Sequence, residues 1–291
     1  MGDDINRLHH VGHVVRDMGA AIGLYRRLGF SVPESLPLSV PRQAGAPGVD
    51  PWAGAGVGPG VGAGDARVSF AEGFVELVSA KTPAPRAEVP CVEGPRTEGV
   101  RALSAGSPDI QSAAGRLESA GVDHHGVRVV RRPLVNPAGP RPEPLRYLEL
   151  DAPEGRLAVA DNPALPAPAD HPNGAIDLVE CLLCVADADL PAVSRRYETY
   201  LGHAASGTSF ELGGGRVTLV PASGLGALLP GERPPAQLPG FAGYVVLVRD
   251  LEVAERFLRA RGVPLTQTPS GDLFVPAAAA HGVAIAFRQA D

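Results

Sequence analysis

Three histidines stand close together in the segment LHHVGHVVRD, which covers residues 8–17. A neutral imidazole can bind a transition metal or transfer a proton near neutral pH, so each of the three is a candidate for chemistry. The segment is rich in valine and has the length of a β-strand, in which successive side chains point to opposite faces. His10 is therefore predicted on one face, and His9 and His13 on the other. His9 begins the strand, where we expect it to be solvated.

The apolar residues of this strand indicate which of its faces is buried. Val11 and Val15 share the face of His13, and an amphipathic helix is predicted directly afterwards, over residues 18–28. Burial of the two valines requires that this face pack against the helix. We therefore expect His13 to lie beneath the helix and His10 to face a cavity.

This strand is the first part of a unit that recurs four times in the chain. An aspartate that can cap a helix, an apolar stripe at helical spacing and a glycine that ends the helix follow the strand. The candidate capping residues are Asp17, Asp109, Asp187 or Asp189, and Asp250, and the glycines are Gly29, Gly121, Gly202 and Gly262. Short strand-like segments come after each glycine, so each unit is predicted to fold as β-α-β-β-β.

The spacing of the units predicts two domains of two units each. Residues 6–161 hold the first pair and residues 176–289 the second, and the segment 162–175 between them is rich in proline, alanine and asparagine, as a linker would be. The first unit carries an insertion over 38–66 that is dominated by glycine, proline and alanine. Such a segment cannot bury enough apolar surface to order itself, so it is either a mobile lid that holds Trp52 or a plain disordered loop.

Composition limits the kinds of partner. The chain has 291 residues and a formal net charge of −6, which provides no basic surface for nucleic acid, and its apolar runs are too short to cross a bilayer. Cys181 and Cys184 stand in one predicted strand at a spacing that directs them to opposite faces, which favours packed thiols. We expect a cytoplasmic monomer or homodimer that acts on a small molecule.

Paired β-α-β-β-β units that begin with LHHVGHVVRDMGAAIGLYRRLGF resemble the vicinal oxygen chelate superfamily, which includes glyoxalases, bleomycin-resistance proteins and extradiol dioxygenases. The resemblance is close in the first unit and recognisable in the other three. It implies an α+β fold in which four βαβββ modules pair into two glyoxalase-like domains. It also implies a half-open barrel whose interior binds a divalent metal through the first and last strands of each unit.

Carried over position by position, the resemblance places metal ligands at His10 and Glu76. An imidazole and a carboxylate suit Zn²⁺, Fe²⁺, Mn²⁺ or Ni²⁺. The other units depart from the pattern, and the first domain keeps half of the usual four-ligand set. The matching positions are Ala102 and Ala158 in the second unit, Glu180 and Thr218 in the third, and Gly243 and Ala284 in the fourth.

This incomplete ligand set has three explanations. A substitute ligand would complete a metal site with His10 and Glu76 in the first domain. Alternatively, the units pair out of order, and the third unit brings Glu180 to the same two residues. Otherwise the metal is absent, and His10 and Glu76 form a hydrogen-bonded base pair or line a ligand pocket. The candidate substitute ligands are His124, His125 and Glu149.

Two functions agree with these residues. The first is a metal-assisted lyase or isomerase that acts next to a carbonyl or enediol oxygen. The metal would polarise that oxygen, and Glu76 would move a proton. His10 and Glu76 are thus the catalytic candidates as well as the candidate ligands. The alternative is a metal-free protein that binds a small molecule, as bleomycin-resistance proteins do. Extradiol oxygen chemistry is disfavoured, because that branch needs two histidines and a glutamate where the second domain has Glu180, Gly243 and Ala284.

Overall fold

A computed structural model of the chain describes residues 4–32, 66–79, 98–124, 126–134, 141–161 and 170–291. Trp52, with nearly all of the 38–66 insertion, lies outside the described residues, as do Cys91 and His125. The predicted domain boundary also stays a prediction, because residues 162–169 belong to the same undescribed part.

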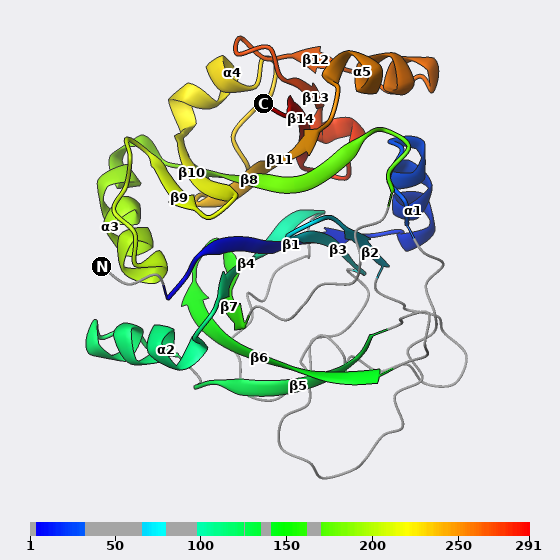
Figure 1. The fold of residues 1–291 in the computed structure, drawn as a ribbon. Helices are drawn as coiled ribbons and strands as arrows, with labels where there is room; N and C mark the ends of the chain where they lie inside the picture. The colour runs from blue at the N-terminus through cyan, green and yellow to red at the C-terminus, as the bar shows by residue number, and fades with distance from the viewer. Residues whose placement is uncertain (1–3, 33–65, 80–97, 125, 135–140, 162–169) are drawn as a thin grey trace.

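The described strands form two seven-stranded sheets (Figure 1). The first sheet has the order β2-β3-β1-β4-β7-β6-β5 and the second the order β12-β13-β14-β11-β8-β10-β9. The strands of the first sheet are β1 (Arg7–Val15), β2 (Ala66–Ser69), β3 (Phe74–Ser79), β4 (Gly99–Ser107), β5 (Arg128–Leu134), β6 (Arg141–Ala152) and β7 (Gly155–Asp161). Those of the second are β8 (Ala175–Val185), β9 (Ser209–Leu212), β10 (Gly215–Pro221), β11 (Gly240–Val248), β12 (Thr266–Gln267), β13 (Leu273–Val275) and β14 (Ala284–Gln289).

The repeat seen in the sequence is visible in the strand pairing. In each unit the last strand pairs in parallel with the first, as β3 does with β1, β7 with β4, β10 with β8 and β14 with β11. Two units then join through antiparallel pairs of their first strands, β1 with β4 and β8 with β11. The fold is α+β, with consecutive units paired in each sheet.

Each unit carries one long helix after its first strand. These helices are α1 (Met18–Arg27), α2 (Ile110–Ser119), α3 (Leu190–Leu201) and α5 (Leu251–Ala260), and a short helix α4 (Leu225–Leu228) follows β10. The carboxylates of Asp17, Asp109 and Asp250 accept backbone N–H groups in the first turns of α1, α2 and α5, which confirms the predicted caps. Asp189 precedes α3 but makes no side-chain capping bond.

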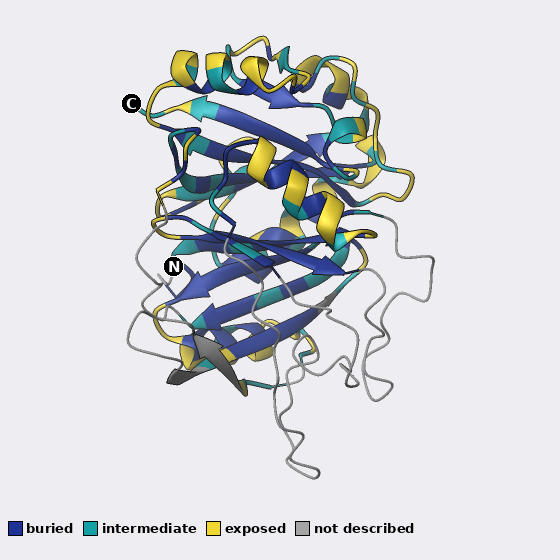
Figure 2. Ribbon diagram, turned by 90° about the vertical axis from the view of Figure 1, so that its right-hand side faces the viewer, coloured by how far each residue is buried: buried dark blue, intermediate teal, exposed yellow. Residues whose placement is uncertain are grey.

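The two sheets pack against each other (Figure 1). We call the face that each sheet turns toward the other its outer face and the opposite one its inner face. Strands β1 and β4 lie against β8, β10 and β11, and the apolar residues between them form one continuous core with the buried sides of α1, α2, α3 and α5. Figure 2 shows this pattern, because the strands are mostly buried while the helices each expose one side. The inner faces of the two sheets therefore point in opposite directions.

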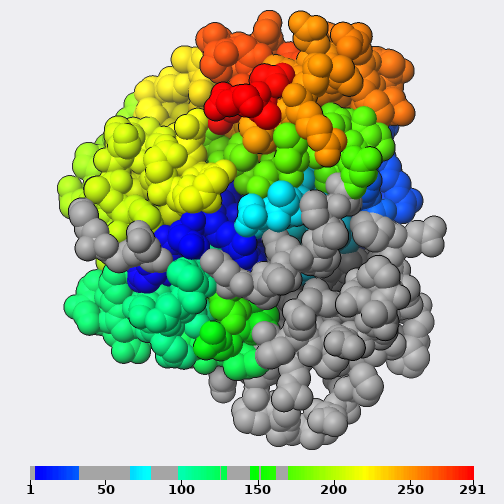
Figure 3. Space-filling view, viewed as in Figure 1, coloured from blue at the N-terminus to red at the C-terminus, as the bar shows by residue number. Residues whose placement is uncertain are grey.

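Polar contacts also join the two halves of the molecule. Arg116 of α2 donates from its guanidinium to the backbone oxygens of Thr199 and Tyr200 in the last turn of α3, and its Nε lies 2.6 Å from Oδ2 of Asp4. The two helices lie one above the other at the left of Figure 3. A guanidinium at a helix C-terminus satisfies carbonyl groups that have no partner in the helix.

The described residues also bear on two predictions from the composition, those on membrane spans and on the cysteines. No helix in the described part of the chain is long and apolar enough to cross a membrane. Cys181 and Cys184 are both buried and unpaired, and they belong to apolar clusters on opposite faces of β8, which confirms the prediction of packed thiols.

Candidate functional site

The inner face of the first sheet carries a row of side chains that crosses five strands. His10 on β1 lies opposite Phe74 on β3 and Ser104 on β4, Ser104 lies opposite Ala158 on β7, and Ala158 lies opposite Glu149 on β6. Register partners in a sheet point to the same face. We call Phe74, His10, Ser104, Ala158 and Glu149 the His10 row.

A second row runs beside the first, two residues further along β1. Glu76 on β3 lies opposite Gly12 on β1 and Arg67 on β2, Gly12 lies opposite Ala102 on β4, and Ala102 lies opposite Arg156 on β7. We call these five residues the Glu76 row. His10 and Glu76, the two residues selected from the sequence, are thus on one face of two adjacent parallel strands.

The middle of this inner face is built from very small residues. The positions on β1, β4 and β7 are Gly12, Ala102, Ser104, Gly106, Ala158 and Ala160. A Cβ atom added at Gly12 would lie 2.9 Å from Cβ of Ala102, closer than two such atoms approach in proteins. Glycine is therefore needed at position 12 for β1 and β4 to pair this closely.

Four of the larger side chains of the two rows gather on β2, β3 and the start of β1, while Glu149 and Arg156 lie at the other end on β6 and β7. The ring of His10 stacks on that of Phe74 with centroids 4.4 Å apart and planes 6° apart, and the guanidinium carbon of Arg67 lies 4.0 Å from the centroid of Phe74. The other end of Arg67 reaches Glu76, with Nη2 3.8 Å from Oε1 of the buried carboxylate. This end of the face combines an imidazole, a carboxylate and a cation over one aromatic ring.

The prediction that His9 is exposed to solvent is wrong. The side chain is buried, and its Nδ1 lies 2.8 Å from Nδ1 of His10. The cause is a β-bulge between Leu8 and His10, where β1 has one residue more than β4. A bulge interrupts the alternation of side chains, so His9 joins His10 beside Phe74 instead of following the outer face.

His13 lies on the outer face beneath α1, as the stripe of Val11 and Val15 predicts. Its Nδ1 is 2.7 Å from the hydroxyl of Tyr25, and its Nε2 is 3.0 Å from the carbonyl oxygen of His281. Burial lowers the pKa of His13 to about 4. The imidazole is therefore neutral at pH 7 and belongs to the core.

The two substitute ligands that lie in the described part of the chain, His124 and Glu149, do not gather around His10 and Glu76. His124 is directed toward α2, with Nε2 3.5 Å from Glu118, and Glu149 stands three strands away from β1, where Arg156 binds one of its oxygens. Within the described residues, no three histidine, cysteine, aspartate or glutamate side chains lie close enough together to hold a metal ion.

Glu180 belongs to the other sheet, so the alternative in which the units pair out of order is wrong. β8, the strand of Glu180, pairs with β10 and β11 in the second sheet, whereas His10 and Glu76 lie in the first sheet. The inner faces of the two sheets point apart. Glu180 therefore cannot complete a site with the other two residues.

These positions test whether a divalent metal fits the first sheet. A firmly held transition metal takes three or four protein ligands, and the described residues place two there, since Ala102 and Ala158 occupy the other matching positions. The guanidinium of Arg67 already lies beside the carboxylate of Glu76. The described residues thus fit a metal only in part.

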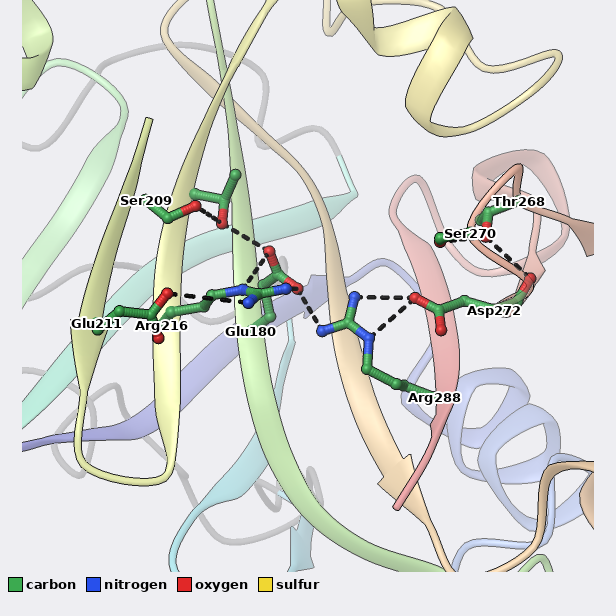
Figure 4. A network of polar contacts seen from close by, with 9 residues as sticks. Glu180, Ser209, Glu211, Arg216, Thr268, Ser270, Asp272 and Arg288 are labelled. Carbon is green, nitrogen blue, oxygen red and sulfur yellow. Dashed lines mark hydrogen bonds and ion pairs between the residues drawn. The ribbon is translucent and has the colours of Figure 1, made fainter. Parts of the chain in front are cut away.

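The second sheet has replaced the ligand pattern with a closed network of charges (Figure 4). Glu180 accepts from the hydroxyl of Thr218 at 2.6 Å, from Nη1 of Arg288 at 2.7 Å and from Nη2 of Arg216 at 3.0 Å. Burial acts to raise the pKa of Glu180, but these hydrogen bonds hold it below its usual range. Arg288 also binds Asp272 at 2.8 Å. Two guanidinium groups supply the positive charge at the position where the resemblance implies a metal.

The rest of this inner face is covered by apolar side chains. Leu225 of α4 and the following Leu229 pack with Leu182, Val245 and Phe274 of the sheet, and all five are buried. The inner face of the second sheet is therefore filled by the chain itself, which makes the first sheet the candidate site.

Four units of this topology, paired in two sheets, define the fold class of the vicinal oxygen chelate superfamily. Residues 8–201 match the sequence model of a family described as a glyoxalase-like domain, and the chain belongs to this family. No curated protein sequence matches the chain.

Solved structures support the same fold assignment. The Mn(II)-bound glyoxalase from Novosphingobium aromaticivorans is 12% identical, with a TM-score of 0.61 over 98% of this chain and 82% of that one. A variant of 4-hydroxymandelate synthase from Streptomyces coelicolor is 15% identical, with a TM-score of 0.60 over 98% and 93%. The 2,3-dioxygenase LapB from Pseudomonas sp. KL28 is 13% identical, with a TM-score of 0.56 over 99% and 93%. At these identities the likeness shows the fold alone.

Proposed function

We propose that the inner face of the first sheet binds a small carbonyl compound and that His10 and Glu76 act on it, in a lyase or isomerase reaction. The observation that carries the proposal is that these two residues share one face of adjacent strands, in neighbouring rows, beside the small residues Gly12, Ala102, Ser104 and Ala158. A ligand lying across the small residues of β4 and β7 would place its end beside the polar groups of β1 and β3.

The chemistry follows from the two side chains. A carboxylate such as Glu76 accepts a proton from the carbon next to a carbonyl group. A neutral imidazole such as His10 donates a hydrogen bond to the carbonyl oxygen, on which negative charge develops as the proton leaves. Return of the proton to a different carbon isomerises the compound, and loss of a neighbouring leaving group makes the reaction a lyase reaction.

The surrounding residues position this pair. Nδ1 of His9 and Nδ1 of His10 form one hydrogen bond, in which one nitrogen donates and the other accepts, so the tautomer of one ring determines that of the other. Phe74 orients the ring of His10 by stacking, and Arg67 provides a positive charge beside the buried carboxylate of Glu76. A preorganised pair of this kind needs little rearrangement during the reaction.

A divalent metal would supply Lewis-acid polarisation of the substrate oxygen, and His10 and Glu76 are the residues that would hold it. One similar structure is described as a Mn(II)-bound glyoxalase. Because the described residues fit a metal only in part, the proton transfer proposed above uses the side chains alone.

A second candidate function is a metal-free protein that binds a small molecule without transforming it. Alanine at both matching positions of the second unit, Ala102 and Ala158, favours this candidate, because neither can contribute a ligand or a base.

Hydrogen exchange separates the two candidates. Hydroxyacetone in D₂O should exchange the hydrogens next to its carbonyl faster with the wild-type protein than without it, as followed by proton NMR. Glu76→Gln should abolish the acceleration, while the control Glu72→Gln, which alters an exposed carboxylate on the turn before β3, should retain it. Binding of hydroxyacetone without accelerated exchange would overturn the enzyme and support the binding protein.

A further inference from the structure

Two oxygen atoms on the inner face of the first sheet are buried without a hydrogen-bond partner among the described residues. They are Oγ of Ser104 and Oε2 of Glu149, in residues that are 1% and 7% exposed. Buried polar atoms in folded proteins nearly always have a partner. These two atoms therefore require an explanation that the contacts among the described residues do not supply.

Both atoms belong to the His10 row and lie on its far side from Phe74. Ser104 is adjacent to His10, and Ala158 separates Ser104 from Glu149. The other oxygen of Glu149 is bound by Nε of Arg156 in the neighbouring row, which fixes the carboxylate and leaves Oε2 for a different donor. Neither residue occupies a position at which the family resemblance implies a metal ligand.

We propose that Ser104 and Glu149 form a second binding subsite, which takes a hydroxyl group of the ligand at the end remote from its carbonyl. This inference rests on the proposed function, because it places the carbonyl at His10 and Glu76. Neighbouring strands are about 4.8 Å apart, so Glu149 lies about 14 Å from His10 and about 10 Å from Ser104 along the sheet, and less across its curvature. The ligand is therefore an elongated molecule that crosses the small residues of β4 and β7.

The charges at the subsite select the ligand's chemistry. A carboxylate only accepts hydrogen bonds, so the ligand group at Oε2 of Glu149 must donate. Arg156 already neutralises this carboxylate, which favours a neutral hydroxyl over an ammonium group. The hydroxyl of Ser104 both donates and accepts, so it fits a carbonyl or a hydroxyl in the middle of the ligand.

The stability of the protein without ligand gives the first test. A buried hydroxyl that has no hydrogen bond until the ligand binds lowers the stability of the ligand-free protein, so Ser104→Ala should raise the Tm of that protein. Ser107→Ala is the matched control on the same strand, because Oγ of Ser107 accepts from the backbone N–H of Asp109 at 3.1 Å and its loss should lower the Tm. A Tm lowered by Ser104→Ala would overturn the subsite.

Two ketones that differ in one hydroxyl give the second test. 8-Hydroxyoctan-2-one should bind the wild-type protein about ten-fold more tightly than octan-2-one, the equivalent of one well-formed hydrogen bond. Ala158→Leu fills the space between Ser104 and Glu149, so it should remove this preference and also weaken the binding of octan-2-one, whose chain crosses the same position. Equal affinities of the wild-type protein for the two ketones would overturn the subsite. Loss of both ketones in His10→Leu is the separate test of the carbonyl end, and it can succeed or fail independently.

Discussion

The hydroxyl of Tyr25 lies 2.5 Å from the hydroxyl of Tyr244 and joins α1 of the first unit to β11 of the fourth. The bond belongs to a buried chain with one direction. Nε2–H of His13 donates to the carbonyl of His281, so Nδ1 must accept from Tyr25, whose oxygen accepts from Tyr244. Every donor in this chain has an acceptor while all of its rings are neutral.

His13→Leu is expected to destabilise the protein by about 1–3 kcal/mol, because it removes the acceptor of the Tyr25 O–H and the donor to the partly buried carbonyl of His281. From the sequence alone, the same change would leave activity largely intact and even stabilise the fold if the ring lacked a buried partner. Urea denaturation measures the effect, and the exchange of hydroxyacetone hydrogens should persist where the variant is folded. Unchanged stability would contradict the hydrogen-bonded chain.

The free energy of unfolding should decrease as the pH is lowered from about 6.5 to 4, because of His13. The folded state holds the pKa of this residue at about 4, below the usual 6.5, mainly through burial, so the unfolded chain binds the proton first as the pH falls. The stabilisation is complete above pH 6.5 and is lost as the pH drops toward 4, a change of about 3 kcal/mol. His281 lies against the same ring and is paired with Glu98, so the measurement is the difference between wild type and His13→Leu in urea denaturation at pH 7.5, 5.5 and 4.5. A constant difference would contradict the assignment.

Arg288→Met should destabilise the protein by about 1–3 kcal/mol, because it removes a cation from Glu180 and Asp272 in a partly buried network. Arg259→Met is the control. Arg259 pairs with Glu255 on the exposed side of α5, and such pairs contribute less than about 1 kcal/mol. Thermal denaturation with and without EDTA compares the two variants, and a similar small effect of both would mean that the network does not hold the second sheet together.

Gly12→Ala should destabilise the protein by about 1–3 kcal/mol through overpacking against Ala102. Ala102→Gly removes the opposing methyl group, so the double variant should recover most of the loss. A double-mutant cycle by urea denaturation gives the coupling between the two positions. Additive effects of the two changes would show that β1 and β4 are not in close contact at this point.

The sequence predicts the parts of this protein that depend on local periodicity. The two-residue period of β1 places His10 and His13 on opposite faces, and the recurring aspartates mark the starts of three helices correctly. His9 is misplaced because a bulge depends on how β1 pairs with β4, which the residues of β1 do not reveal.

The contacts between distant segments lie beyond such reasoning. Glu180 meets Arg288 from 108 residues away, and no spacing rule relates these two positions. Ser104 and Glu149 likewise come into one row only through the pairing of β4, β7 and β6. The sequence gives only a weak indication that Arg67 and Phe74 belong to the candidate site. Phe74 is two residues from Glu76 on the same short strand, and Arg67 is on the short strand β2 that pairs with it.

Strand β1 serves both halves of the molecule at once. His10 faces the candidate site, while His13, three residues later, is tied to β11 through Tyr25 and to the backbone of His281. The second sheet can therefore vary the residues of its inner face while it keeps the outer face that contacts the first sheet. Substitutions of Tyr244 on β11 should therefore require compensating changes at Tyr25 on α1, and the apolar outer face of β1 would lose its covering if the second sheet were removed.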